Sequence, residues 1–256
     1  MCGICGFIKR DNNLSGESLM EMNDAIRHRG QDDEGYVCLV NNKLEAYSGS
    51  NSILEIKNKL LPLPTGLTFK TGVGFSRLSI LDLSEQGHQP MLNETEDVVI
   101  TFNGEIYNYK EIRAELINKG FIFRSKSDTE VILKGYEYWG KEIVNKLNGM
   151  FAFCLLDIKK EIIWLARDRM GLKPLFYHES EKDITWASEI KSILKANWVK
   201  PEINWDGLSA NFYLQTTPPP ITCFRNIFSV KPGSWIEVNI NSLEKNEQIY
   251  WKIPVG

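Results

Sequence analysis

Short strand-like runs, many of them close enough together to form hairpins, constrain what this chain can fold into more than any other feature. Such runs alternate apolar and polar residues, or are apolar throughout and bounded by turn residues. They cover residues 2–9, 35–40, 73–80, 98–102, 150–156, 162–166, 174–178, 184–187 and 235–240.

Fewer segments show helical spacing. Leu19, Met22 and Ile26 lie three to four residues apart, with Ser15 as the expected cap and Gly30 just beyond the end. Because strands outnumber helices, we expect antiparallel sheets flanked by helices. The other predicted helices are one with Ile112 and Leu116 that stops at Gly120, one from the Ser127–Glu130 capping box to Trp139, and a short one over 189–194.

Three stretches interrupt this pattern. Residues 43–70 are polar and then proline-containing, which indicates an inserted surface excursion rather than a core element. Pro218-Pro219-Pro220 marks a second break. Residues 250–256 carry no terminal cap, so we expect the sequence to be cut from a longer protein.

The composition is typical of a globular protein that binds neither nucleic acid nor membrane. Of the 256 residues, 43% are hydrophobic and 25% charged, and the net charge is −3. No run approaches the ~18 apolar residues of a membrane span, and the N-terminus lacks the apolar run of a signal peptide. We therefore expect a cytoplasmic protein. Its five scattered cysteines fit reduced thiols: Cys2, Cys5, Cys38, Cys154 and Cys223.

Cys2 occupies a position at which a nucleophile and its base can share one residue. Removal of Met1 would leave an α-amine, which titrates near ~7.7–8.0, beside a thiol that reacts only as thiolate. Two other interpretations use the same residue: a small buried residue opening a strand, and, together with Cys5, a redox pair or half a zinc site. Neither the other cysteines nor the histidines supply a second ligand pair, so no metal is expected.

Further candidate site residues lie downstream. Asn103 offers an amide N–H, and Gly104 allows a backbone N–H to approach a ligand, so the pair could form an oxyanion hole. Arg77 could hold a carboxylate, and Asp128 an ammonium group. Each also has a structural interpretation, as a turn, a surface charge or a helix start.

Eight short motifs follow one another over residues 1–200. They read MCGICGF (1–7), RHRGQDDEG (27–35), RLSILDLSEQGHQPM (77–91), TFNGEIYNY (101–109), SDTEVIL (127–133), LNGMFAF (147–153), ARDRMGLKPLFY (166–177) and ASEIKSIL (187–194). In this order they resemble the glutaminase domain of the asparagine synthetase family, a class II glutamine amidotransferase. A weaker similarity continues through residues 218–235.

The resemblance implies a fold and a site. The fold is α+β, a four-layer αββα sandwich of two antiparallel sheets like that of N-terminal-nucleophile hydrolases. The domain is residues 1–256, with a core of about 2–200 and a lead-in, 201–256, toward a synthetase domain absent from this sequence. The implied catalytic residues are Cys2, Asn103 and Gly104, and the substrate-binding residues are Arg77, Leu78, Ile80, Leu81, Glu105 and Asp128, with Arg29 and Gly30 in support.

The implied reaction is hydrolysis of glutamine to glutamate and ammonia, which would feed asparagine synthesis. This domain needs no cofactor; ATP and Mg²⁺ would belong to the synthetase half, whose Ser-Gly-Gly-x-Asp-Ser loop does not occur here. Gln31, where the family usually has proline, and the 43–70 excursion depart from the pattern. Two alternatives stay open: amidation of another carboxylate, as in surface-polysaccharide synthesis, and a non-catalytic glutamine-sensing module. A homodimer is compatible with either.

Overall fold

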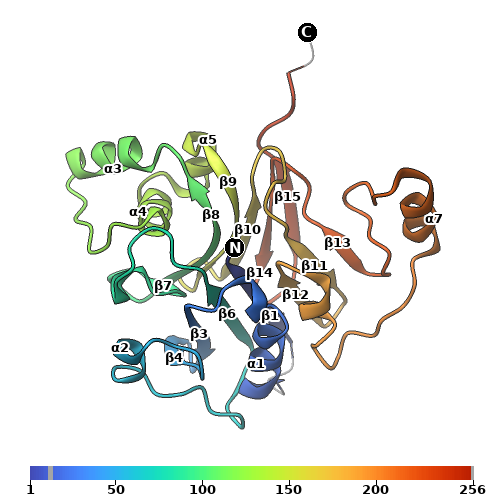
Figure 1. Cartoon of the computed structure of the whole chain (residues 1–256), viewed down its shortest axis with the longest axis horizontal. Coiled ribbons are helices and arrows are strands. Elements are labelled where there is room, and N and C mark those ends of the chain that lie inside the picture. The colour runs from blue at the N-terminus through green and yellow to red at the C-terminus, as the bar shows by residue number, and fades with distance from the viewer. Residues whose placement is uncertain (11–13, 255–256) are drawn as a thin grey trace.

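Two antiparallel β-sheets packed face to face form the centre of this computed structural model, which describes residues 1–10 and 14–254 (Figure 1). The larger sheet has the order β13-β11-β12-β1-β6-β3-β4 and the other β15-β14-β10-β9-β8-β7. The strands of the first are β1 (Gly3–Lys9), β3 (Asp33–Val40), β4 (Lys43–Ser48), β6 (Thr71–Arg77), β11 (Phe176–Glu179), β12 (Asp183–Ala187) and β13 (Ile227–Ser229). Those of the second are β7 (Met91–Leu92), β8 (Val98–Ile106), β9 (Gly149–Asp157), β10 (Ile162–Arg167), β14 (Ser234–Asn239) and β15 (Lys245–Ile249).

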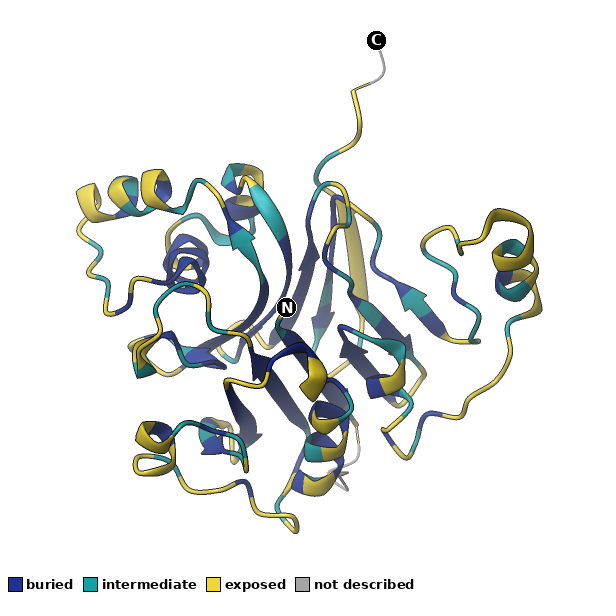
Figure 2. Ribbon diagram, viewed as in Figure 1, coloured by how far each residue is buried: buried dark blue, intermediate teal, exposed yellow. Residues whose placement is uncertain are grey.

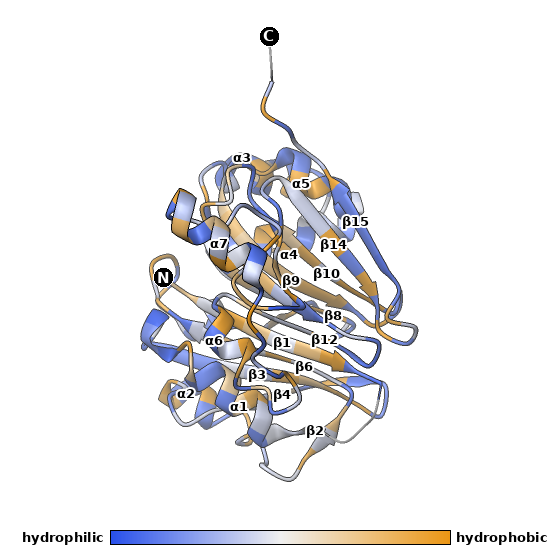
Figure 3. Cartoon of the chain, turned by 90° about the vertical axis from the view of Figure 1, so that its right-hand side faces the viewer, coloured by the Kyte–Doolittle hydropathy of each residue, from blue (hydrophilic) through white to orange (hydrophobic). Residues whose placement is uncertain are grey.

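Helices cover the outer faces of both sheets, and β2 (Leu14–Ser15) pairs with β5 (Thr68–Phe69) in a small ribbon. Seen from the side, the helices and sheets stack in four layers (Figure 3). The helices are α1 (Gly16–Asp24), α2 (Leu54–Lys57), α3 (Tyr109–Asn118), α4 (Asp128–Trp139), α5 (Ile143–Lys146), α6 (Ile190–Ile193) and α7 (Trp205–Leu214), with 3-10 turns η1 (Arg27–Arg29), η2 (Glu85–Gly87) and η3 (Gly140–Glu142).

Three apolar clusters hold the layers together. The first fills the space between the sheets, the second joins the six-stranded sheet to α3, α4 and α5, and the third joins the seven-stranded sheet to α1 and α6. Most strands are accordingly buried along most of their length, the exception being the exposed edge strand β15, whereas the outer helices are exposed on one side (Figure 2). The predicted four-layer αββα sandwich is confirmed.

Strand alternation decides which residues face the inter-sheet space. On β1, Ile4 and Ile8 enter the central cluster, while Cys5 and Phe7 face α1. Cys2 lies just before β1 and two residues from Ile4, so its side chain lies on the same face as that of Ile4 and packs against the central cluster. The residue expected to react therefore points between the two sheets.

Most predicted elements are present, and α4 begins as expected, with Ser127 Oγ accepting the backbone N–H of Glu130 at 3.3 Å. The interpretation of residues 43–70 as a surface excursion was wrong in part. Lys43–Ser48 forms β4, the edge strand beside β3, and Leu44 and Tyr47 are buried. An edge strand with one solvent-exposed face carries many polar residues, which is why the sequence of β4 resembled that of a loop.

Residues beyond 200 add three strands that had not all been anticipated. β13 extends the seven-stranded sheet, and β14 and β15 extend the other sheet beyond β10. Ile236 and Val238 of β14 belong to the central cluster. This part of the predicted lead-in is thus built into the same two sheets, whereas Val255 and Gly256 lie outside the described residues. Within those residues, no helix combines the length and apolar character needed to cross a membrane.

Gly6 on β1 lies where the sheet leaves no room for a side chain. A Cβ there would overlap the indole ring of Trp186 and stand 2.7 Å from the carbonyl oxygen of Gly72. We predict that Gly6→Ala lowers the free energy of unfolding by about 1–3 kcal/mol, as overpacking does. Gly66→Ala is the control, because a Cβ at Gly66 meets no atom within 4 Å. Urea denaturation of both variants measures the difference; equal stabilities would contradict this packing.

Candidate active site

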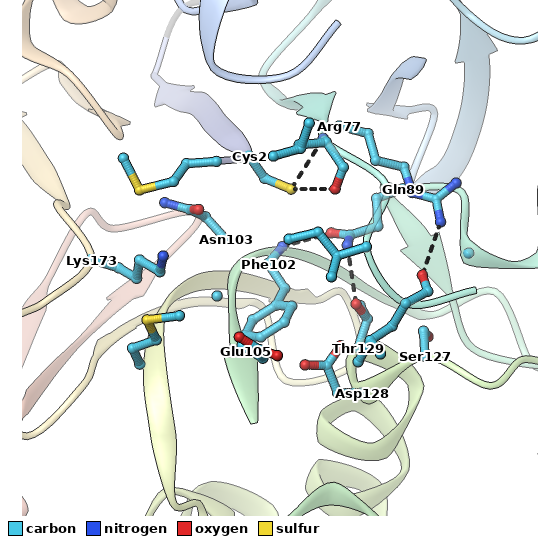
Figure 4. A pocket seen from close by; sticks show the side chains of 17 residues that line it. Cys2, Arg77, Gln89, Phe102, Asn103, Glu105, Ser127, Asp128, Thr129 and Lys173 are labelled. Atoms are coloured by element: carbon cyan, nitrogen blue, oxygen red, sulfur yellow. Dashed lines mark hydrogen bonds between the residues drawn. The ribbon is translucent and has the colours of Figure 1, made fainter. Parts of the chain in front are cut away.

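One cavity of about 210 Å³ is lined by every residue predicted to be catalytic or to bind substrate, whereas the supporting Arg29 and Gly30 do not line it. Cys2 lies on one side of it, and the carboxylates of Glu105 and Asp128 lie across from Cys2 (Figure 4). The predicted residues lining it are Cys2, Arg77, Leu78, Ile80, Leu81, Asn103, Gly104, Glu105 and Asp128. Sequence reasoning missed the other lining residues, which are Met1, Gly87, Gln89, Phe102, Ser127, Thr129, Met150 and Lys173.

The Cys2 thiol is held against the backbone that follows β6. The N–H of Leu78 donates to Cys2 Sγ at 3.4 Å, and Sγ lies 3.5 Å from the carbonyl oxygen of the same residue. Burial raises the pKa of the Cys2 thiol, and the Leu78 N–H, the N-terminal amine and Arg77 oppose that rise. A thiol in this environment needs a base to become a nucleophile.

Arg29 fixes the main chain at Cys2. Its Nε donates to the carbonyl oxygen of Cys2 at 2.9 Å, and its Nη1 pairs with Glu189 Oε1 at 2.8 Å. Gly30 lies directly against the backbone of Arg77. The RHRG segment thus braces both the nucleophile candidate and the strand that carries Arg77.

Cys5 lies on the other face of β1, away from this cavity. Its Sγ is 3.8 Å from Asn23 Oδ1 and from the Gly74 carbonyl oxygen, and burial raises the pKa of its thiol far above the ordinary value. Cys2 and Cys5 are three positions apart in extended chain, and an odd separation puts their thiols on opposite faces of the sheet; both thiols are free. The structure therefore gives no support to the redox-pair interpretation.

Asn103 presents an unused donor to the cavity. Its side chain is 1% exposed, and its Nδ2 has no hydrogen-bond partner among the described residues. Leaving a buried amide N–H unpaired costs about 1–3 kcal/mol. Because Asn103 also lines the cavity, this N–H is available to an acceptor placed there.

Gly104 contributes a second donor through the open edge of β8. β7 pairs with β8 only at Val99 and Ile100, so beyond that point the edge has no neighbouring strand. Phe102 and Ile106 direct their N–H groups to this edge, where Gln89 Oε1 and Asp128 Oδ2 accept them at 2.7 and 2.9 Å. Gly104 lies two residues from each of them along β8, and alternate N–H groups of a strand point to the same edge, so the Gly104 N–H also points to this open edge.

No side chain among the described residues accepts the N–H of Gly104, whereas those on either side of it are satisfied. A side chain at this position would strike the carbonyl oxygen of Met150 and come within 2.8 Å of Phe151 Cα, so only glycine fits. Asn103 and Gly104 thus provide two neighbouring free donors in the cavity that holds the Cys2 thiol.

Arg77 lines the cavity and also donates hydrogen bonds to the neighbouring loop. Its Nη1 donates to Ser84 O at 3.4 Å, and its Nη2 donates to Leu81 O at 3.4 Å and to Asp82 O. These bonds hold the loop that forms one cavity wall. Its Nε and the second hydrogen of Nη1 make no hydrogen bond within the described part of the chain, so they remain for a ligand.

Asp128 is a buried carboxylate at the first turn of α4. Burial raises its pKa from the ordinary 3.8 to about 6, Glu105 adds to the rise, and backbone N–H groups of Ile106, Asp128 and Thr129 oppose it. A carboxylate whose ionised form is disfavoured by burial, and which lines a cavity, is a candidate for binding a cation. Lys173 is also buried there, with no carboxylate within 4 Å among the described residues.

Comparison with known proteins places this arrangement in a class. A solved structure of the Bacillus subtilis glutamine phosphoribosylpyrophosphate amidotransferase superposes with a TM-score of 0.72 over 98% of this chain and 49% of that one, at 21% identity. The likeness extends over nearly the whole described fold. The chain therefore shares the two-sheet sandwich fold of that structure.

A family model described as the glutamine amidotransferase domain matches residues 66–251, so the chain belongs to that family of enzymes. A putative asparagine synthetase (glutamine-hydrolyzing) 2 of Methanocaldococcus jannaschii is 35% identical over 99% of this chain and 47% of its own length. The asparagine synthetase (glutamine-hydrolyzing) 2 of Bacillus subtilis is 35% identical over 99% and 31%. The chain thus spans less than half of these relatives. The resemblance drawn from the motifs is confirmed.

The raised pKa of Asp128 predicts how the free energy of unfolding depends on pH. The folded protein holds the Asp128 proton more tightly than the unfolded chain does, so ionising this carboxyl destabilises the fold as pH rises from about 4 through 6. Asp128→Asn should raise the free energy of unfolding by about 1–3 kcal/mol at pH 7.5. The gain should vanish at pH 4. Denaturant unfolding at both pH values measures it, and a loss of stability at pH 7.5 would show that the carboxylate is structural.

Proposed function

We propose that residues 1–256 form a glutaminase domain in which Cys2 hydrolyses the side-chain amide of glutamine. The observation that carries this proposal is that the Cys2 thiol shares one cavity with two N–H donors, Asn103 Nδ2 and Gly104 N, for which the described residues supply no acceptor. A nucleophile beside preformed donors is what acyl transfer from an amide requires.

The first step is transfer of the thiol proton. With Met1 removed, the α-amine of Cys2 takes this proton, directly or through a water, and the thiolate attacks the amide carbon. Met1 also lines the cavity, so its removal clears space beside the thiol. Arg29, through its bond to the Cys2 carbonyl oxygen, holds the residue while its side chain reacts.

The second step is collapse of the tetrahedral intermediate. Asn103 Nδ2–H and the Gly104 N–H bind the oxyanion, the amine returns the proton to the leaving nitrogen, and ammonia departs. Water then hydrolyses the γ-glutamyl thioester to glutamate and regenerates the thiol. Loss of one such donor in other acyl-transfer enzymes costs roughly 2.7–4 kcal/mol of barrier.

Three charged lining residues, Arg77, Asp128 and Glu105, bind the α-carboxylate and α-ammonium groups of glutamine. The free N–H groups of Arg77 take the α-carboxylate, and Asp128, assisted by Glu105, takes the α-ammonium. The backbone of Leu78, Ile80 and Leu81 forms the wall between them and the thiol. Together these contacts fix the distance from the α-carbon to the reacting amide.

We further propose that the ammonia is passed to a synthetase domain for asparagine synthesis, because the similar full-length relatives are named asparagine synthetases. ATP and Mg²⁺ would be bound by that domain; the glutaminase reaction written above uses neither. Ile80, Tyr107 and Leu172, all on segments that line the cavity, are 56–64% exposed, which suits docking of another domain at the mouth. A cytoplasmic location and a homodimer complete the proposal.

Two other functions make different demands on the same residues. An amidotransferase that amidates another carboxylate would keep this glutaminase site and differ only in the acceptor domain. A glutamine-sensing module would need the α-group contacts of Arg77 and Asp128 but no free oxyanion donors. The unpartnered Asn103 Nδ2 favours catalysis over sensing.

Cys2→Ala is predicted to abolish ammonia release from glutamine, whereas Cys5→Ser should retain most of it. Only Cys2 faces the cavity; Cys5 packs beneath the sheet, where a serine hydroxyl can use the same two acceptors, Asn23 Oδ1 and the Gly74 carbonyl. A coupled ammonia assay measures both variants against the wild-type chain. Equal losses in the two variants would restore the redox-pair interpretation.

Asparagine serves as the substrate control in the same assay. Its amide is one methylene closer to the α-groups, so with these held by Arg77 and Asp128 it stops short of the thiol. Misplacement of about 1 Å can cost on the order of a hundredfold in rate. Equal rates on the two amides would refute the assignment of the α-group contacts.

A further inference from the structure

Gln89 is a buried amide that connects two parts of the site, β8 and α4. Its side chain is 5% exposed and lies at the cavity wall between β8 and α4 (Figure 4). Its Oε1 accepts the N–H of Phe102 at 2.7 Å, and its Nε2 donates to Thr129 Oγ1 at 3.0 Å. Phe102 directly precedes Asn103, and Thr129 directly follows Asp128.

The bond to Phe102 replaces a missing strand. β7 stops pairing with β8 at Ile100, so the next N–H along that edge, from Phe102, would be buried without a partner. Gln89 Oε1 takes the position that a backbone carbonyl of β7 would have occupied. The edge is thereby held in strand geometry up to Gly104, whose N–H is the next one along it.

The bond to Thr129 fixes Gln89 itself. A glutamine side chain has three rotatable bonds, and an acceptor fixed at only one end would lose its orientation. Thr129 lies in the first turn of α4, and the neighbouring Asp128 accepts the N–H of Ile106 at 2.9 Å. Gln89 and Asp128 thus hold β8 on both sides of the Gly104 N–H and anchor it to the same helix.

We propose that Gln89 is a positioning residue for the oxyanion site, which keeps the Asn103–Gly104 peptide oriented toward Cys2 by joining β8 to α4. The inference rests on the proposed glutaminase function. Gln89 does not touch the reacting atoms. It acts through Phe102 on the donor that stabilises the tetrahedral intermediate, so its loss lowers turnover more than it lowers glutamine binding.

Gln89→Met tests this by removing both hydrogen bonds from a side chain of similar length. We expect kcat for glutamine to fall about tenfold or more, less than the hundredfold or greater loss typical when an oxyanion donor is deleted. KM should change less than threefold, because Ile106 still holds Asp128. Alkylation of Cys2 by iodoacetamide, followed by peptide mass spectrometry, needs no oxyanion donor and should keep its rate within twofold.

Gln86→Met is the matched control, since Gln86 is an exposed glutamine on the same loop and its side chain makes no hydrogen bond among the described residues. Thr129→Val supplies a milder variant that keeps the bond to Phe102 but releases Gln89 from α4. It should lower kcat several-fold. Because both residues act through one connection, the double variant should be no slower than Gln89→Met alone.

Three results would overturn the inference. They are a Gln89→Met kcat within twofold of wild type, a parallel fall in kcat and in Cys2 alkylation, and multiplied losses in the double variant. Should Gln89→Met fail to fold, Thr129→Val is judged by the same kcat and alkylation rates. A wild-type chain without glutaminase activity would instead overturn the proposed function.

Discussion

The alternation of side chains along β1 and β8 is the constraint on which the site depends. Because the two sheets face each other, an even position on β1 and an odd position on β8 both point into the space between them. Cys2 immediately precedes β1 in this alternation and Asn103 lies within β8, and both side chains line the same cavity. A one-residue slip in either strand would turn the thiol or the amide toward the helices instead.

Three polar groups around this cavity lower the stability of the folded chain. Asn103 Nδ2 is buried without a partner, Asp128 is a carboxylate whose pKa is raised by burial, and the edge of β8 is open at Gly104. Each would be relieved by a ligand that brings an acceptor or an ammonium group. The apolar clusters on both faces of each sheet are large enough to hold these groups in place. The proposed function thus implies that stability is given up where glutamine would bind.

Local patterns were sufficient to predict antiparallel sheets flanked by helices, and the ordered motifs predicted the four-layer sandwich and the nine candidate residues that line one cavity. It failed where tertiary context outweighs pattern. β4 and β15 are polar edge strands whose partners, rather than their own alternation, define them; every residue of β15 is exposed. α7 is rich in apolar residues but buries only Gly207, so it carried no amphipathic signal. Gln89 and Lys173 lie inside two of the quoted motifs, but only the folded chain shows that their side chains line the same cavity as Cys2.

The most direct test of the account is the chemical state of the N-terminal peptide during turnover. The purified chain is mixed with glutamine, quenched in acid, digested and examined by mass spectrometry. The account predicts a peptide that begins at Cys2, without Met1, and that carries a γ-glutamyl group on the Cys2 sulfur. Turnover by protein that retains Met1, or a glutamyl group on any other residue, would contradict it.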